Sequence, residues 1–97
     1  MLSTLSSPIP AIHLASPELI LLQDLDRENG TQYFETLRTY LLMERDIPKT
    51  AQALIIHRTT LLYRLKKIQA ITELDLEDPG QRLYLLLSLR IMEKQLQ

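Results

Sequence analysis

Apolar residues recur along the chain at the three- and four-residue spacing of amphipathic helices, and strict alternation of apolar and polar residues is lacking. Ser16-Pro17-Glu18 is typical of a helix start, because serine caps the helix, proline fits its first turn and an acid suits its positive end. Capping and helix-breaking residues divide the rest of the chain into further helices in the same way. The pattern therefore predicts an all-α fold, a small five-helix bundle containing a helix-turn-helix.

The helix boundaries follow from capping and breaking residues. The first helix is expected to end near Asn29-Gly30, a C-cap pair, and the second to be capped by Thr31 and stopped by Asp46-Ile47-Pro48. The other three are expected at residues 48–54, 58–71 and 79–94. The positions expected to face the core are Leu19, Leu22 and Leu25; Phe34, Leu37, Tyr40, Leu41 and Leu42; Ala51 and Leu54; and Leu61, Leu65 and Ile68. On the last helix the spacing places Leu83, Leu86, Leu87, Arg90 and Ile91 along one side.

Residues 49–68 predict two short helices joined by a tight turn, the arrangement of a helix-turn-helix. The small Ala51 allows the two helices to cross closely, and Leu61 fills the facing position. On a helical wheel Leu61, Leu65 and Ile68 form one narrow core-facing sector. The outward face is polar and cationic: Thr59, Tyr63, Lys66 and Lys67 lie opposite the core, with Arg58, Thr60 and Arg64 on the shoulders.

The net charge of −1 conceals a strong asymmetry. Residues 45–68 hold six basic residues against one acidic residue, a balance of +5, while residues 1–44 stand at −4 and residues 69–97 at −2. No carboxylate interrupts residues 47–72. Because phosphate attraction depends on a local basic patch rather than on the overall charge, this segment is suited to a nucleic acid duplex.

An ordered series of motifs resembles the C-terminal helix-turn-helix domain of PucR/CdaR-type bacterial transcription regulators, over roughly residues 17–92. The motifs are Thr36-Leu37-Arg38-Thr39-Tyr40-Leu41, Thr50-Ala51, Leu54, His57-Arg58-Thr59-Thr60-Leu61-Leu62-Tyr63-Arg64-Leu65, Leu74-Asp75-Leu76 and Asp78-Pro79. Residues 51–65 are also similar to the shorter Fis-type helix-turn-helix. One departure is Ile55, where helix-turn-helix proteins often have glycine; a β-branched residue resists positive φ, so a slightly different turn geometry is expected.

The resemblance implies a DNA-binding output domain at the end of a larger regulator whose upstream part, absent from this chain, senses a metabolite. It implies double-stranded DNA as the partner and residues 58–71 as the recognition helix in the major groove. Arg58 and Thr60 match the positions that meet DNA in the Fis-type motif. The full set of candidate DNA-binding residues is Lys49, Thr50, His57, Arg58, Thr59, Thr60, Tyr63, Arg64, Lys66 and Lys67. Lys49 and Thr50 are expected to hold backbone phosphate at the start of the third helix.

Other interpretations of these residues remain open. The basic face could be a solvated helix surface, or it could serve an acidic partner in a helical protein–protein interaction module. Arg64 could pair with Glu35, Glu44 or another acid, and His57 could cap the helix or pack half-buried.

Tyr33, Tyr40 and Tyr84 are expected in the core or at its edge. The leucine-rich last helix could be buried on most sides or form a subunit interface, and we expect a homodimer in the intact regulator.

The remaining features of the sequence concern the division into domains, the cellular location and the possibility of an active site. Residues 1–16 are expected to be a flexible leader or linker remnant, and residues 17–97 the helix-turn-helix domain. The chain has no cysteine, no long apolar run for a membrane span and no basic start for a secretory signal, so a cytoplasmic location is expected. The acidic residues of 73–78 lack a histidine, cysteine or glycine-rich phosphate loop to complete an active site. An enzyme, a cofactor and a metal site are therefore not expected.

Overall fold

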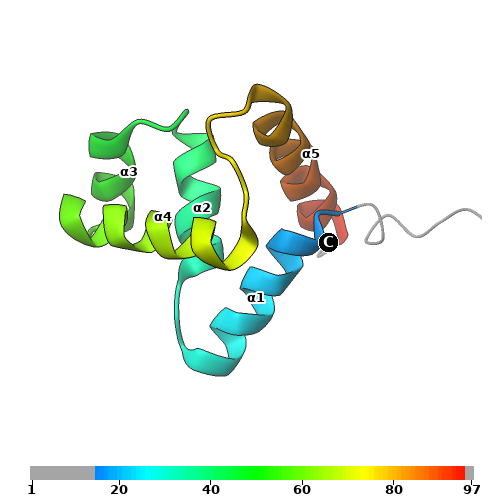
Figure 1. The fold of residues 1–97 in the computed structure, drawn as a ribbon, viewed down its shortest axis with the longest axis horizontal. Helices are drawn as coiled ribbons and strands as arrows, with labels where there is room; N and C mark the ends of the chain where they lie inside the picture. Colours follow the sequence, from blue (N-terminus) through cyan, green and yellow to red (C-terminus); the bar gives the residue numbers. More distant parts are fainter. Residues whose placement is uncertain (1–14, 96–97) are drawn as a thin grey trace, which may run out of the picture.

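A computed structural model describes residues 15–95 of the chain, which form five helices connected by short loops (Figure 1). The helices are α1 (Pro17–Asn29), α2 (Tyr33–Leu42), α3 (Ile47–Leu54), α4 (Arg58–Thr72) and α5 (Pro79–Gln95). The predicted all-α fold with five helices is confirmed. None of the helices among these residues is long and apolar enough to cross a membrane.

The expected leader lies almost wholly outside the described residues. Its last two residues, Ala15 and Ser16, are buried, so the packed unit begins slightly earlier than expected. The Ser16 N–H donates to Ser88 Oγ (3.1 Å), and the Ser16 hydroxyl accepts from the Leu19 N–H (3.3 Å). Ser16 therefore caps α1, as predicted, and also joins the start of α1 to α5.

Helix α2 lies at the centre of the bundle and packs against the four other helices (Figure 1). Leu37, Tyr40 and Leu41 are buried in the core as predicted, whereas Leu42 is exposed and the expectation for it was wrong. The cap at the start of α2 also differs from the prediction. Asp26 of α1 supplies it: the Asp26 carboxylate accepts hydrogen bonds from the N–H groups of residues 33 and 34 (2.9 and 2.7 Å) and from the Thr31 hydroxyl (2.6 Å).

Helix α2 ends at Leu42, four residues before the expected stop. Glu44 and Arg45 adopt positive φ, and the Arg45 N–H donates to the Tyr40 carbonyl (2.8 Å), which reverses the chain before α3. Asp46 is therefore the N-cap of α3 instead of the end of α2, and its carboxylate accepts from the Lys49 N–H (2.9 Å).

The side of α5 that packs on the bundle is not the side that carries Leu83, Leu87 and Arg90. Leu85, Ser88, Leu89 and Met92 face the core, while Leu83, Leu87 and Arg90 are exposed and Leu86 and Ile91 are half-buried. Tyr84, expected in the core or at its edge, is exposed as well. Because α5 carries leucines on nearly every side, its sequence pattern does not single out one core face. The polar Ser88 belongs to the buried face since its hydroxyl meets the backbone of Ser16.

Candidate nucleic-acid interface

Helices α3 and α4 form a helix-turn-helix at one side of the bundle, with the three residues 55–57 between them (Figure 1). Ala51 of α3 is buried where the two helices approach each other. Leu61 of α4 is fully buried on the side of its helix that faces the bundle. Leu65 and Ile68 continue the same buried row, as the helical wheel predicted. These aliphatic contacts fix α4 on the bundle with its opposite face outward.

The turn has the left-handed geometry that glycine usually provides, although its residue is isoleucine. Ile55 has φ 56° and ψ 51°, and the Ile56 N–H donates to the Ala51 carbonyl (3.0 Å) to close α3. The expectation that Ile55 would change the turn geometry was therefore wrong. Ile55 is 89% exposed as a residue, so its burial offsets almost none of the strain of this conformation.

Replacing Ile55 by glycine should raise the free energy of unfolding by about 1 kcal/mol, because the steric strain of a β-branched residue at positive φ is relieved and little packing is lost. Urea unfolding followed by circular dichroism measures this change. Ala53→Gly, an exposed position inside α3, is the matched control and should lose about 1 kcal/mol. A less stable Ile55→Gly chain would show that the turn is not strained.

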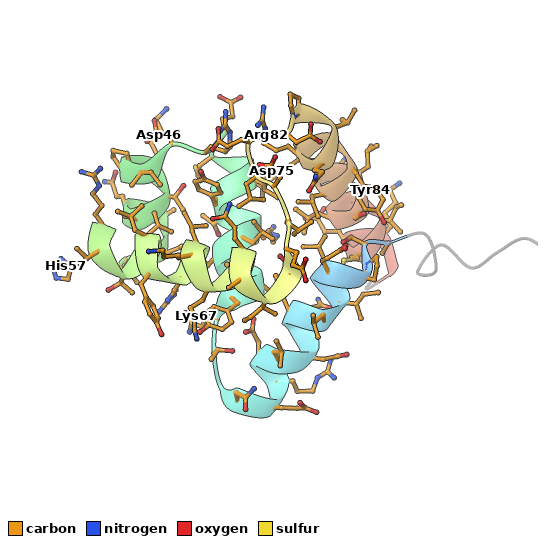
Figure 2. The ribbon with its side chains drawn as sticks, in the orientation of Figure 1. Asp46, His57, Lys67, Asp75, Arg82 and Tyr84 are labelled. Atoms are coloured by element: carbon orange, nitrogen blue, oxygen red, sulfur yellow. The ribbon has the colours of Figure 1, made fainter. Side chains whose placement is uncertain are left out.

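The outward face of α4 presents most of the predicted contact residues to solvent. Arg58, Thr59, Lys66 and Lys67 are exposed, Tyr63 is 59% exposed, and Thr60 is half-buried on the shoulder. His57 is the N-cap residue of α4, one of its two alternative roles, but its side chain forms no capping hydrogen bond. The side chain is exposed at the tip of α4, so the alternative of half-buried packing was wrong. Figure 2 shows His57 projecting from the start of α4, away from the bundle.

The cations of this surface are not neutralised by neighbouring acids. The ion pairs recorded among residues 15–95 involve Arg27, Arg38, Arg45 and Arg90 as cations, and not those of α3 or α4. Since residues 47–72 contain no carboxylate, the positive charge of Lys49, Arg58, Lys66 and Lys67 is available to an external anion.

Arg64 has a different position from the rest of the basic residues. It is half-buried, and its Nη1 donates to the Thr36 hydroxyl (3.2 Å), which itself donates to the Gln32 carbonyl (2.7 Å). The alternative of an ion pair with Glu35 or Glu44 was therefore wrong. Arg64 ties α4 to the start of α2 and lines a shallow hollow there with Thr60, Tyr63 and the connection at residues 30–33.

Thr50 is placed inside the fold, which corrects its inclusion among the contact residues. Its side chain is fully buried, its hydroxyl donates to the Asp46 carbonyl (2.7 Å), and its N–H donates to the same carbonyl (2.9 Å). The backbone N–H of Lys49 is also occupied, by the Asp46 carboxylate. Lys49 remains at the surface through its exposed side chain alone.

Sequence reasoning missed two neighbours of His57. Gln52 and Ile55 are exposed and share a shallow hollow with His57 at the tip of the helix-turn-helix. The amide of Gln52 can donate to and accept from a base edge, and the apolar Ile55 side chain can contact a thymine methyl group. Both residues could have been found from the sequence, because they stand next to the turn from which α4 begins.

A helix-turn-helix set in an all-α bundle, with an exposed and uncompensated cationic face on its second helix, defines a class of DNA-binding protein. The chain belongs to the family of PucR C-terminal helix-turn-helix domains, whose sequence profile matches residues 33–91. The predicted family and its function as a DNA-binding domain of transcription regulators are thereby confirmed.

Three curated relatives of the chain are from Bacillus subtilis strain 168. The chain is 40% identical to the proline-responsive transcriptional activator PutR over 77 residues, which are 79% of this chain and 19% of PutR. It is 35% identical to the DNA-binding transcriptional activator AdeR over 74% of this chain and 18% of AdeR, and 39% identical to the purine catabolism regulatory protein over 67% and 12%. The chain thus spans about a fifth or less of these relatives. No solved structure matches it significantly.

Proposed function

We propose that α4 lies in the major groove of duplex DNA and reads base edges with Arg58, Thr59 and Tyr63. The observation that carries this proposal is the exposed face of α4, on which basic and hydroxyl side chains stand together. Arg58, Lys66 and Lys67 belong to none of the ion pairs within residues 15–95. An α-helix with its side chains is about 10–12 Å wide, which suits a major groove of about 12 Å. Arginine matches the two acceptors of guanine, and hydroxyl groups serve either base or phosphate.

The lysines take a separate role in this arrangement. Lys66 and Lys67 lie further along α4 than Arg58, and Lys49 lies on the first helix of the motif, so we assign all three to backbone phosphates. Arg64 acts through its hydrogen bond to Thr36 by fixing the angle of α4 on the bundle. Phosphate contacts set the register of the protein on the duplex, and the start of α4 supplies the sequence discrimination.

The domain serves, in this proposal, as the output domain of a larger cytoplasmic regulator with a sensor part upstream. PutR is named as proline-responsive, which is a property of that protein. For the regulator that carries this chain, we propose two-fold action on two half-sites, because one domain of this size reads a single half-site.

Binding to a fluorescently labelled duplex of random sequence, measured by anisotropy over a series of salt concentrations, tests DNA binding. We expect micromolar or tighter binding at low salt, and a slope of log affinity against log salt of about −2.7 for the three lysine contacts. Weak binding with a flat salt dependence would contradict the proposal. Tight binding of an acidic polypeptide in the same assay would then favour a protein–protein interaction module.

A further inference from the structure

Helix α5 carries an exposed apolar face opposite the side that packs on the bundle. We name as the α5 stripe the residues Gly80, Leu83, Tyr84, Leu87, Arg90, Ile91 and Lys94, which recur at three- and four-residue spacing. Leu83 and Leu87 are 59% and 55% exposed. An aligned row of exposed leucines differs from isolated surface leucines, because one straight helix can cover all of it at once.

We propose that the α5 stripe is where a second copy of this chain packs, with the two α5 helices antiparallel across a two-fold axis near Leu87. The inference deepens the proposed two-fold action on DNA and rests on it. A two-fold interface uses the same patch on both copies, so the patch must complement itself. The α5 stripe meets this condition only in the antiparallel orientation.

Charge selects the antiparallel orientation. The two basic residues of the α5 stripe, Arg90 and Lys94, lie in its C-terminal half, and the stripe contains no acid. Parallel packing would set each cation against its own copy. Antiparallel packing about Leu87 separates the two Arg90 positions by about 9 Å along the helix axis, which weakens the repulsion between their charges.

The ends of the α5 stripe are complementary in the same orientation. Lys94 comes opposite Gly80, at the end of α5 that Glu77 and Asp78 precede. Glu77 is paired with Arg45 (3.0 Å) but its side chain is 76% exposed, and the Asp78 carboxylate accepts from the Gln81 N–H (3.0 Å). Arg90 is free to turn toward a partner, since its side chain is 76% exposed and its ion pair with Glu93 is long (3.9 Å). Leu83 then meets Ile91, and Leu87 meets its own copy at the axis.

The position of the stripe is compatible with DNA binding by both copies. Figure 2 shows Tyr84 of α5 and His57 of α4 on opposite sides of the molecule. A helix of 17 residues is about 25 Å long, so one pair of stripes buries less than the roughly 1,200–2,000 Å² of a stable interface. The isolated chain should therefore form a weak, concentration-dependent dimer, which two adjacent half-sites on DNA would strengthen.

Sedimentation equilibrium of the 97-residue chain without DNA tests this inference directly. We expect reversible dimerisation of the unaltered chain and at least a tenfold weaker association for Leu87→Glu, which brings two carboxylates together at the axis and removes two buried leucines. Leu21→Glu is the matched control, because Leu21 is an exposed leucine of α1 outside the stripe, and it should associate as the unaltered chain does.

Cross-linking tests the orientation, and the absence of cysteine from the chain removes background. With a short thiol-reactive cross-linker, Leu87→Cys should couple to itself, and Leu83→Cys should couple to Ile91→Cys in a mixture better than to itself. Preferential self-coupling of Leu83→Cys would show parallel packing and overturn the proposal. A chain that stays monomeric at every concentration, with Leu87→Glu unchanged, would overturn it too and assign the stripe to another occupant, such as an upstream part of a longer regulator.

Failure of the dimer proposal can be distinguished from failure of the DNA-binding proposal. Leu87→Glu should bind a duplex too short for two domains with the same affinity and salt slope as the unaltered chain, and lose only the added affinity on a longer duplex. Loss of binding to the short duplex by an otherwise folded Leu87→Glu chain would instead place α5 in the DNA contact and contradict its role as a dimer surface.

Discussion

Replacing Lys66 and Lys67 together by alanine should lower the affinity for duplex DNA about fifty-fold near 0.1 M salt. Both lysines are exposed on α4 and belong to none of the recorded ion pairs of residues 15–95. Each phosphate contact that is lost removes about 0.9 from the slope of log affinity against log salt, so the double variant should lose about 1.8. Fluorescence anisotropy over a salt series measures the affinity and the slope together.

The control removes one positive charge elsewhere on the surface. Arg27→Ala lies on α1, and the ion pair of Arg27 with Asp24 (3.2 Å) is exposed, so it contributes little to stability. The DNA affinity of the Arg27→Ala chain should fall much less than that of Lys66→Ala or Lys67→Ala alone. Equal losses for Arg27→Ala and for Lys67→Ala would show that net charge alone, rather than the face of α4, determines binding.

Enlarging Ala51 to leucine should destabilise the domain by about 1–3 kcal/mol and weaken DNA binding even where the chain remains folded. Ala51 is buried between α3 and α4, and a larger side chain there must separate the two helices or displace Leu61. The change alters the angle at which α4 leaves the bundle. Urea unfolding measures the loss of stability, and anisotropy at a temperature where the variant is folded measures the loss of affinity.

Ala53→Leu supplies the comparison for Ala51→Leu, because both positions lie on α3 but Ala53 is exposed. The exposed substitution should change the free energy of unfolding by no more than about 0.5 kcal/mol. If Ala51→Leu melts and binds as the unaltered chain does, the close crossing of α3 and α4 is not what positions the recognition helix.

The helix-turn-helix could be predicted from the sequence because several independent signals agree there. The narrow aliphatic sector of α4, the small Ala51 and the local positive charge all agree with a helix-turn-helix whose second helix keeps its basic face exposed. The family resemblance then added the function, which composition and spacing alone could not provide. Thr59, Tyr63 and Lys67 are exposed in the structure as the helical wheel required.

The errors arose where tertiary contacts decide between local alternatives. Thr50 looked like a surface residue, but its hydroxyl satisfies the Asp46 carbonyl, which allows a polar side chain to be buried. Thr31 looked like a cap until Asp26, five residues earlier, supplied the cap from another helix. Ile55 adopts a left-handed backbone conformation that its own preference opposes, at the position where α3 ends and the chain turns toward α4.

The face of α5 could not have been assigned from periodicity. Leucines lie on the buried side at 85 and 89 and on the exposed side at 83 and 87, so the pattern fits two orientations. Burial of Ser88 against Ser16 selects one of them, and that contact joins positions 72 residues apart. The exposed leucines that result are the observation on which the proposed dimer surface rests.

The central claim is that the exposed face of α4 meets the duplex, and an amide chemical-shift titration of the 97-residue chain with a short DNA duplex at low salt tests it most directly. We predict the largest shift changes at residues 57–67 and at Lys49, with small changes along α1 and α5. Shift changes concentrated on α1 or α5, or no change at low salt, would contradict the claim.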